Sequence, residues 1–346
     1  MSHYLLVSQI ERLQLEPTSH CNLLCPRCSR TDNGQLNSRL PLTDWQPESY
    51  EILFSQIPNR QLKEVLFNGN YGDPITSKNL LHGLEHIKNN TSASLRLHTN
   101  GSLKGTEFWK EIATYFKSDK DRLVFSIDGL DSTNALYRVN SRFPKILENA
   151  QAFIQSGGKA RWDYLIFDHN RHQVDEAQKL AKKLGFIEFN AKKTARPVNL
   201  KNSQQNKGDS LEVTQSVNKY GSWSDYIARS SIDCKFRNHV RGLFVDFQFD
   251  VWPCCWLGGP LYFADASDPR RKELENLVEH YGPNFNSLAH HSLDSILNHP
   301  WMAEELVKSW QMQSPLPKLR VCTRMCGEAF EASSGANWSN SHIQSL

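Results

Sequence analysis

Short apolar runs alternate with helix-length amphipathic stretches over roughly the first 195 residues of the chain. This alternation predicts βαβ units and a parallel sheet. Six strands are expected, at residues 12–16, 65–68, 94–98, 123–127, 161–167 and 186–192. Helices are expected between them, at residues 46–56, 79–89, 107–116, 146–155 and 174–184, the last one ended by Gly185.

A polar segment separates this part from the rest of the chain. Residues 198–222 are rich in Asn, Gln, Ser, Lys and Gly, which is typical of a solvated linker. After it, the pattern predicts a small hairpin at residues 242–247 and 250–253, and helices at residues 292–298 and 301–310. The chain is therefore expected to have a first domain at 1–197, a linker at 198–230 and a second domain at 231–346.

Composition and charge narrow the function only a little. The 346 residues are 39% hydrophobic and 22% charged, as in an ordinary globular protein, and a net charge of +3 gives no reason to expect a nucleic-acid partner. No segment approaches the roughly 20 apolar residues of a membrane span, and the apolar run at residues 4–7 is too short for a signal peptide. The protein is expected to be cytoplasmic, where eight cysteines favour metal binding or catalysis over disulfides.

Three of these cysteines share one loop. The sequence LEPTSHCNLLCPRCSR places Cys21, Cys25 and Cys28 in a C-x3-C-x2-C pattern directly after the first expected strand. Composition alone predicts such a trio only about 0.004 times in a chain like this, so the spacing indicates a shared role. Thiolates are the usual ligands of iron–sulfur clusters. Three ligands for four irons leave one iron that a small molecule can bind.

A structural zinc site is the alternative for this loop. His20 or a distant cysteine would then complete a tetrahedron around the metal. Zinc knuckles usually combine two close ligand pairs, whereas the next cysteine here is Cys234, far along the chain. The spacing therefore favours the iron–sulfur interpretation.

The three-cysteine loop resembles the motif of the radical S-adenosylmethionine (SAM) superfamily. In that family the three cysteines bind a [4Fe-4S] cluster, and SAM chelates the fourth iron through its amino and carboxylate groups. An electron from the reduced cluster splits SAM into methionine and a 5′-deoxyadenosyl radical, which abstracts a hydrogen atom from the substrate. The resemblance thus implies an enzyme whose cofactor supplies the reactivity, while the protein positions it and excludes water.

Loops after the second and third expected strands extend the resemblance. In FNGNYGDPI, Gly72, Asp73 and Pro74 stand where the family has Gly, Glu and Pro in the loop that binds the SAM amino group. Asp-Pro is also an ordinary turn pair, but α/β folds bind ligands at the carboxyl ends of strands. The stretch TNGS, which contains Asn100, resembles another family turn. The resemblance implies that all four residues lie in the cofactor site.

Two further segments are similar to family motifs. FSIDG resembles a Ser-Ile-Asp-Gly segment, which implies that Ser126 and Asp128 lie near the methionyl or ribose groups of SAM. In LYRVN, Arg138 is implied as a partner of the SAM carboxylate, although a surface ion pair explains an arginine equally well. The resemblance covers residues 10–195 and implies an α/β partial (β/α)6 barrel, an open TIM-like barrel with cluster and SAM at its C-terminal face.

The other five cysteines lie in the last third of the chain. Their region resembles the SPASM domain, or its shorter twitch form, a small α+β domain that follows some radical SAM barrels and binds a second cluster. The resemblance implies a second [4Fe-4S] cluster with four protein ligands, namely Cys234, Cys254, Cys322 and Cys326. Cys255 is an alternative to Cys254 as a ligand. Zinc bound by the same thiolates is an alternative to iron and sulfide.

Cys255 is left over if Cys254 is a ligand. An extra cysteine is most often a buried bystander, but this one is also a candidate catalytic residue that donates a hydrogen atom to a substrate radical. Relatives with this domain plan dehydrogenate, epimerise or crosslink small molecules and ribosomally made peptides. The resemblance therefore implies a peptide or small-molecule substrate and an electron donor such as flavodoxin or ferredoxin.

Two other functions stay open at this point. A radical SAM enzyme that modifies RNA would need a basic stripe, for which Lys192, Lys193 and Arg196 are a short candidate. A cluster-carrying electron-transfer or scaffold protein would have no turnover of its own. The SAM-like loops argue against the second, since electron transfer needs no SAM pocket.

Overall fold

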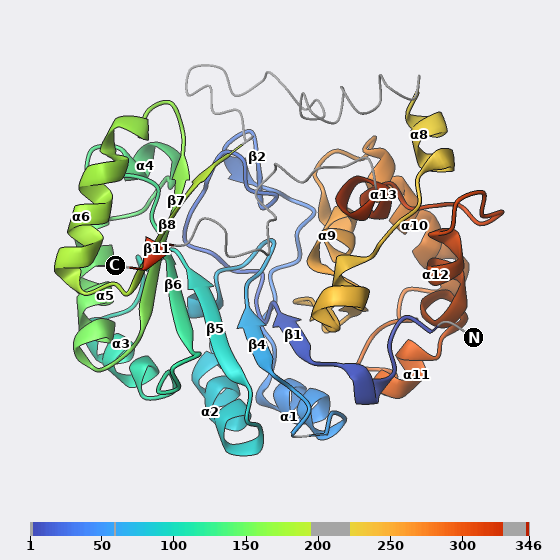
Figure 1. Cartoon of the computed structure of the whole chain (residues 1–346), viewed down its shortest axis with the longest axis horizontal. Coiled ribbons are helices and arrows are strands. Elements are labelled where there is room, and N and C mark those ends of the chain that lie inside the picture. Colours follow the sequence, from blue (N-terminus) through green and yellow to red (C-terminus); the bar gives the residue numbers. More distant parts are fainter. Residues whose placement is uncertain (1–2, 59, 195–221, 328–343, 346) are drawn as a thin grey trace.

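A parallel sheet forms the centre of the molecule. The computed structural model describes residues 3–58, 60–194, 222–327 and 344–345. Six strands run parallel and follow chain order across the sheet, as consecutive βαβ units do: β1 (Arg12–Leu15), β4 (Glu64–Phe67), β5 (Ser94–Thr99), β6 (Arg122–Ser126), β7 (Ala160–Ile166) and β8 (Glu188–Lys193). Each lies within about two residues of its predicted position. The sheet curves into part of a barrel (Figure 1).

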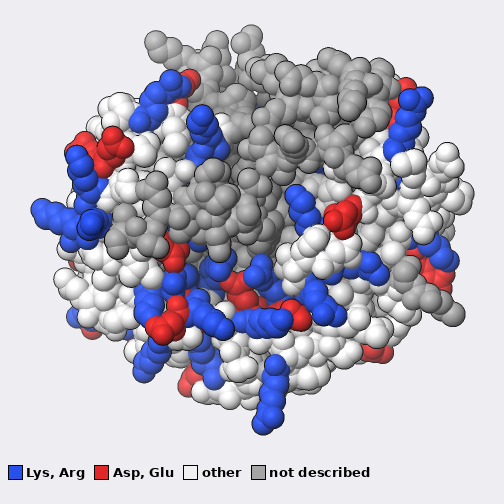
Figure 2. Space-filling view, in the orientation of Figure 1, with Lys and Arg blue, Asp and Glu red and all other residues white. Residues whose placement is uncertain are grey.

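The two faces of this sheet differ in polarity. Leu13, Val65, Leu97, Phe125 and Trp162 point outwards and are completely buried in the main hydrophobic core. Because successive side chains of a strand alternate between faces, the intervening positions line the inside of the barrel, and most of them are polar or charged. Figure 2 shows basic and acidic side chains gathered in a band over the lower part of the sheet. The inner face is thus suited to polar contacts.

Helices cover the outer face of the sheet (Figure 1). The five predicted helices are confirmed, as α1 (Pro47–Ser55), α2 (Leu80–Asn90), α3 (Thr106–Ala113), α5 (Phe143–Gln155) and α6 (Val174–Leu184). Helix α6 ends at Gly185, whose φ of 90° lies in the left-handed region that glycine adopts freely. Helix α5 begins three residues before its predicted start, since Pro144 occupies its first turn.

Several short elements were not predicted, because they are too short to show a period. Among them are the hairpin of β2 (Thr31–Asp32) and β3 (Gln35–Leu36), the turn α4 (Asn134–Tyr137), and three 3-10 turns, η1 (Val7–Gln9), η2 (Pro74–Thr76) and η3 (Arg171–Gln173).

The C-terminal part extends the same sheet. Strand β9 (Gly242–Val245) pairs in parallel with β1, and β10 (Val251–Trp252) pairs with β9 in antiparallel orientation. The predicted hairpin is therefore confirmed, but its pairing with β1 is a contact that the pattern did not show. At the opposite edge, β11 (Gln344–Ser345) pairs with β8.

Helical segments make up most of the rest of the C-terminal part: α8 (Trp223–Arg229), the π-turn η4 (Phe236–Val240), α9 (Cys255–Gly258), η5 (Pro260–Tyr262), α10 (Pro269–Tyr281), α11 (Leu293–Leu297), the π-turn η6 (Trp301–Glu305), α12 (Leu306–Ser309) and α13 (Arg320–Cys326). The helices predicted at residues 292–298 and 301–310 are confirmed. Helix α10 was missed because its sequence is mostly polar. It begins at Pro269, and the Asp268 carboxylate accepts the N–H of Arg270 as an N-cap.

The N-terminal segment packs against the C-terminal part of the chain. The Tyr4 hydroxyl donates to the carbonyls of Gly242 (3.1 Å) and Pro253 (2.9 Å), and its ring meets Trp310 edge-on.

The partial α/β barrel is confirmed. Most of the predicted linker at 198–230 lies outside the described residues, and the domain boundaries stay predictions. Within the described ranges, no helix combines the length and apolar character that crossing a membrane requires.

Candidate functional site

The three-cysteine loop lies at the carboxyl end of β1. Cys25 is buried, whereas Cys21 and Cys28 are half-buried. The Cys28 N–H donates to the Cys25 carbonyl (3.1 Å) and closes a turn between them. Burial, Asp73 and the neighbouring thiols of Cys28 and Cys25 raise the pKa of Cys21 to about 12. The structure therefore brings the three predicted ligands together, as thiols whose protons a metal would displace.

Asn100 joins this loop to two others. Its side-chain Nδ2 donates to Asp73 Oδ2 (2.6 Å) and to Asn22 Oδ1 (3.0 Å), and it lies 3.9 Å from the Cys21 sulfur. The Ser102 N–H donates to Asn100 Oδ1 (2.9 Å). One buried amide thus connects the loops that follow β1, β4 and β5.

The Asp73 carboxylate is a structural anchor for the site. It is buried, and its Oδ2 also accepts the Asn100 N–H (2.7 Å) and the Thr99 hydroxyl (3.1 Å). Its Oδ1 accepts the Ile75 N–H (3.1 Å) at the start of η2, where Pro74 is the first residue. Burial raises the pKa of Asp73, and the hydrogen bonds from the backbone N–H groups of Asn100 and Ile75 oppose that rise. Asp73 and Pro74 therefore shape the loop after β4.

Glu16, at the end of β1, was not singled out in the sequence. Its Oε1 accepts the backbone N–H groups of Tyr71 (2.6 Å) and Gly72 (3.0 Å), while its Oε2 is buried without a partner among the described residues. Burial raises the pKa of Glu16 to about 7. Gly72 also approaches the β1 loop so closely that a Cβ there would lie 1.8 Å from the Thr18 carbonyl oxygen. Glu16 continues the polar alternation of Arg12 and Gln14 along β1, so no signal in the pattern singled it out.

Three predicted site residues, Ser126, Asp128 and Arg138, lie at the end of β6 or after it. Ser126 is half-buried at the end of β6 and lies in register with Asp163 on β7. Asp128 is completely buried, and its carboxylate accepts Arg138 Nε (2.7 Å) and the Leu165 N–H (2.7 Å). Arg138 is therefore held by a buried carboxylate rather than by a surface ion pair. The carboxylate of Asp128 is engaged with protein groups and positions Arg138.

Four of the C-terminal cysteines lie near one tyrosine. Tyr4 has a pKa well above its ordinary value because of its burial and because the four thiols add to that rise. The Cys234 thiol hydrogen-bonds to Cys326 and lowers the pKa of Cys326 to about 7. The residues that converge here are Cys234, Cys254, Cys322 and Cys326. Tyr4 lies far from them in the sequence, and no local pattern indicated its place.

Cys255 faces another direction. Burial raises the pKa of its thiol to about 12, and a hydrogen bond from the Gln14 side chain opposes the rise. Gln14 lies on the inner face of β1, and Asn70 Nδ2 donates to the Cys255 carbonyl (2.7 Å). Cys28, in turn, lies 3.9 Å from the Asn70 carbonyl oxygen. Cys254 is therefore the member of the pair that joins the other three thiols, and Cys255 lies on the barrel side.

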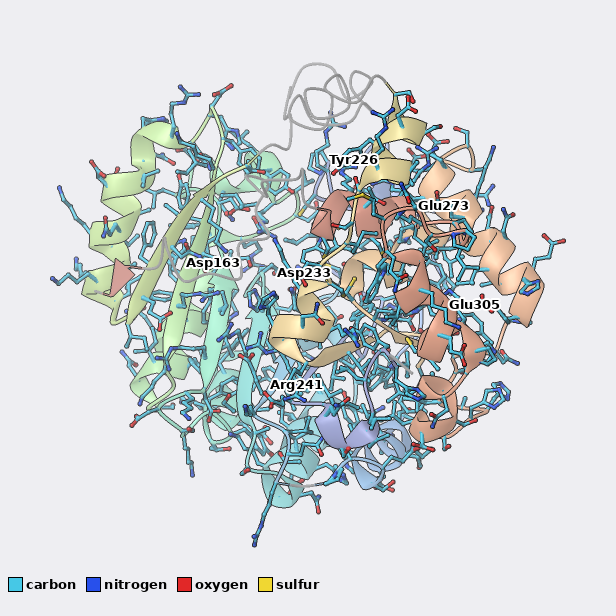
Figure 3. The ribbon with its side chains drawn as sticks, turned by 45° about the vertical axis from the view of Figure 1, so that its right-hand side comes forward. Asp163, Tyr226, Asp233, Arg241, Glu273 and Glu305 are labelled. Carbon is cyan, nitrogen blue, oxygen red and sulfur yellow. The ribbon has the colours of Figure 1, made fainter. Side chains whose placement is uncertain are left out.

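The thiol groups are not arranged around a single point. Among the described residues, no three Cys, His, Asp or Glu side chains lie close enough together to hold one metal ion. Ligands of a four-iron cluster bind different irons, so their sulfurs need not converge on one centre. The donor sets, three and four thiols, fit the two clusters that the resemblance implies. Figure 3 shows sulfur atoms within the C-terminal part.

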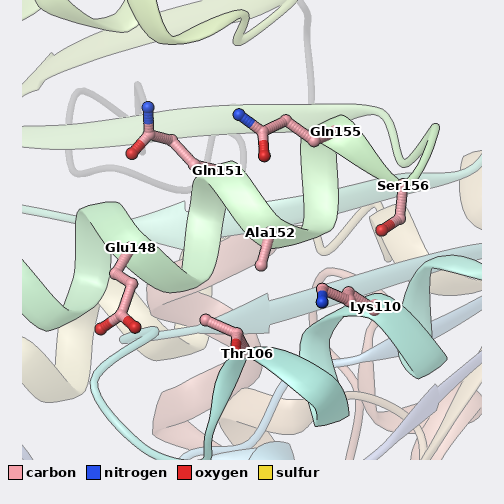
Figure 4. Close-up of a pocket in the computed structure, with 7 residues that line it drawn as sticks. All are labelled: Thr106, Lys110, Glu148, Gln151, Ala152, Gln155 and Ser156. Atoms are coloured by element: carbon pink, nitrogen blue, oxygen red, sulfur yellow. The ribbon is translucent and has the colours of Figure 1, made fainter.

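Two openings in the surface differ in their relation to this site. One is lined by residues around the first cysteine of the loop, among them His20, Cys21 and Asn22. The other, shown in Figure 4, lies between α3 and α5 and is lined by residues such as Thr106 and Gln151. None of the predicted site residues lines the second opening.

Solved structures share this architecture. No protein-family model and no curated protein matches the sequence. SuiB of Streptococcus suis bound to S-adenosylmethionine is 15% identical, over 91% of this chain and 77% of SuiB, with a TM-score of 0.52. SuiB bound to precursor peptide SuiA is similar at 15% identity, over 92% of this chain and 77% of SuiB, with a TM-score of 0.53. Native anSMEcpe with bound AdoMet, which is SAM, is 15% identical over 87% of this chain and 84% of anSMEcpe, with a TM-score of 0.52.

At 15% sequence identity, the similarity to these structures shows a shared fold. The chain has the α/β fold of SuiB and anSMEcpe over most of its length. The α/β partial barrel that the motifs implied is thereby confirmed.

Proposed function

We propose that this protein is a radical SAM enzyme in which Cys21, Cys25 and Cys28 hold a [4Fe-4S] cluster. The observation that supports this best is the contact of Asn100 with Asp73, Asn22 and Cys21, because it joins three motif loops at the proposed cluster. The fold shared with SuiB and anSMEcpe, both solved with SAM bound, supports it further. When bound, cluster and SAM together supply a 5′-deoxyadenosyl radical for hydrogen abstraction.

The protein's own residues then bind and orient SAM. Gly72, Asp73 and Pro74 shape the loop that receives the amino group, and Asn100 fixes that loop against the cysteines. Arg138 is held by Asp128 through Nε, and its other guanidinium N–H groups make no hydrogen bond to the described residues, so they can bind a carboxylate. Ser126, half-buried at a strand end, is proposed to face the ribose or methionyl group.

We propose that the second cysteine set binds a second [4Fe-4S] cluster in a SPASM- or twitch-like domain. Its four thiols are all of one soft type, which suits iron and sulfide and also zinc. Metal analysis separates these two possibilities. Cys255, outside the set and next to the inner face of β1, is the proposed hydrogen-atom donor. Asn70 and Gln14 hold it in place from the barrel side.

The proposed substrate is a peptide or a small biosynthetic molecule. The complex of SuiB with precursor peptide SuiA supports a peptide. Flavodoxin or ferredoxin is the proposed electron donor. A cytoplasmic location is proposed because all eight cysteines are free thiols, as a reducing compartment keeps them.

Anaerobic reconstitution tests the assignment. Protein loaded with iron and sulfide should contain about eight irons per chain, and with SAM and dithionite it should release 5′-deoxyadenosine. Cys28→Ala should keep about four irons per chain and should release no 5′-deoxyadenosine. Cys326→Ala should lose the second cluster. Cys255→Ala is the matched control, since it should keep both clusters and 5′-deoxyadenosine release.

Three outcomes would contradict the proposal. If Cys28→Ala still releases 5′-deoxyadenosine, the three-cysteine loop is not the SAM-cleaving site. If zinc copurifies with the first loop and no iron binds there, the radical SAM assignment fails. If zinc replaces iron only in the second set, the assignment of the auxiliary cluster fails while the first stands.

A further inference from the structure

Charged side chains line the inner face of the barrel. They follow inward positions of the strands, two residues apart or on neighbouring strands. The basic ones number five and the carboxylates three: Arg12, Arg96, Arg122, Arg161 and Lys192, with Glu64, Asp163 and Glu188. Asp163 is labelled in Figure 3. Among the described residues of this network, positive charge exceeds negative charge.

Each carboxylate in the network is shared between cations. Arg12 Nε (2.5 Å) and Arg96 Nη2 (2.9 Å) form ion pairs with different oxygens of Glu64. Asp163 forms an ion pair with Arg161 Nε (2.7 Å), while Lys192 Nζ lies 3.6 Å from its other oxygen. Because the cations share these carboxylates, some of their N–H donors have no acceptor in the described part of the chain. Arg96 Nε is buried without a hydrogen-bond partner among the described residues, and the contact of Lys192 with Asp163 is too long for a hydrogen bond.

His98 lies among these groups on β5. Its side chain is half-buried and makes no hydrogen bond with the part of the chain that the structure describes. Burial lowers the pKa of His98 to about 3, so its ring is neutral and offers one N–H donor. Arg96, Arg161, Asp163 and Lys192 are the charged groups that act on it. Arg96 and His98 stand two residues apart on the inner face of β5, and Lys192 acts on His98 from β8 together with Asp163. An imidazole N–H and a guanidinium N–H without partners among the described residues, and a loosely paired ammonium, therefore belong to one part of the inner wall.

We propose that Arg96, His98 and Lys192 form a carboxylate-binding subsite for a substrate peptide segment that bears Asp or Glu side chains. The proposal rests on the proposed function and adds the chemical class of the substrate. A carboxylate fits because it carries a single charge, which two partly compensated cations can neutralise. The sugar–phosphate backbone of RNA fits less well, because it needs an exposed basic stripe, whereas the side chain of Arg161 is 6% exposed and that of Lys192 30% exposed.

Calorimetry with two synthetic peptides tests the subsite on the anaerobically reconstituted full chain. Acetyl-tetraglutamate amide should bind at least about tenfold more tightly than acetyl-tetraglutamine amide. Arg96→Gln and Lys192→Gln should each weaken tetraglutamate binding by about tenfold, which corresponds to about 1.4 kcal/mol. The matched control is Lys110→Gln, at an exposed position of α3 outside the barrel, which removes the same charge and should leave both affinities unchanged.

The outcomes separate the subsite from the SAM chemistry. Equal affinities for the two peptides, or no binding of either, would overturn the subsite. The subsite is also overturned if Arg96→Gln and Lys192→Gln lower only the unfolding temperature, because the charged network would then serve only to stabilise the fold. Tight binding of oligouridylate without binding of tetraglutamate would overturn it as well. If tetraglutamate is preferred but wild-type protein releases no 5′-deoxyadenosine, the proposed function fails and the subsite stands. Lys192→Gln, at a half-exposed position, keeps the test valid if Arg96→Gln misfolds.

Discussion

Replacing Glu16 by Gln should change how the stability of this protein depends on pH. Glu16 is 1% exposed, and burial raises its pKa from 4.5 to about 7. A raised carboxyl pKa means that the folded protein holds the proton more tightly than the unfolded chain. The contribution of the raised Glu16 pKa to the free energy of unfolding is therefore fully present below pH 4.5 and is lost as the pH rises through about 7. At 1.36 kcal/mol per pH unit, the loss is about 3 kcal/mol.

Glu16→Gln removes this loss without removing the acceptor for the N–H groups of Tyr71 and Gly72. Urea unfolding of the metal-free protein at pH 4.5 and at pH 8 measures the effect. The free energy of unfolding of the variant, relative to wild type, should rise by about 3 kcal/mol between the two pH values. Glu85→Gln, at an exposed position of α2, is the control. A difference between Glu16→Gln and wild type that stays constant with pH would refute the reasoning.

Two further substitutions test the packing around the site. Gly72→Ala places a Cβ 1.8 Å from the Thr18 carbonyl oxygen, so the loop must shift, and we expect at least about a tenfold loss of SAM affinity by calorimetry, with no such loss for Gly105→Ala, where a Cβ meets open space. Unchanged SAM affinity of Gly72→Ala would show that this loop does not bind SAM. Lys88→Met leaves the fully buried Asp121 without its cation (2.9 Å), and we expect a loss of about 3 kcal/mol in urea unfolding. A loss below about 1 kcal/mol would mean that water or other groups compensate Asp121.

The candidate site was predictable where its residues belong to a local motif. Cys21, Cys25 and Cys28 share a fixed spacing, and Asp73 and Asn100 stand in short turns after strands, so their types and order were visible in the sequence. The structure brings them together because the carboxyl ends of parallel strands meet at one edge of the sheet. Glu16 stood beside the motif, but its contact with the loop after β4 depends on the pairing of two strands.

The alternation of apolar and polar positions was enough to determine the strands and helices of the barrel and their order, because a strand repeats every two residues and a helix about every 3.6. Only the tertiary structure decided that β9 adds to β1, that Tyr4 lies among four distant cysteines, and that Cys254 joins them while Cys255 turns towards Gln14. The resemblance favoured Cys254 as the ligand, but two adjacent cysteines are equivalent in composition, so the sequence left Cys255 open as an alternative. Their roles depend on backbone direction and on which distant side chains pack around each thiol.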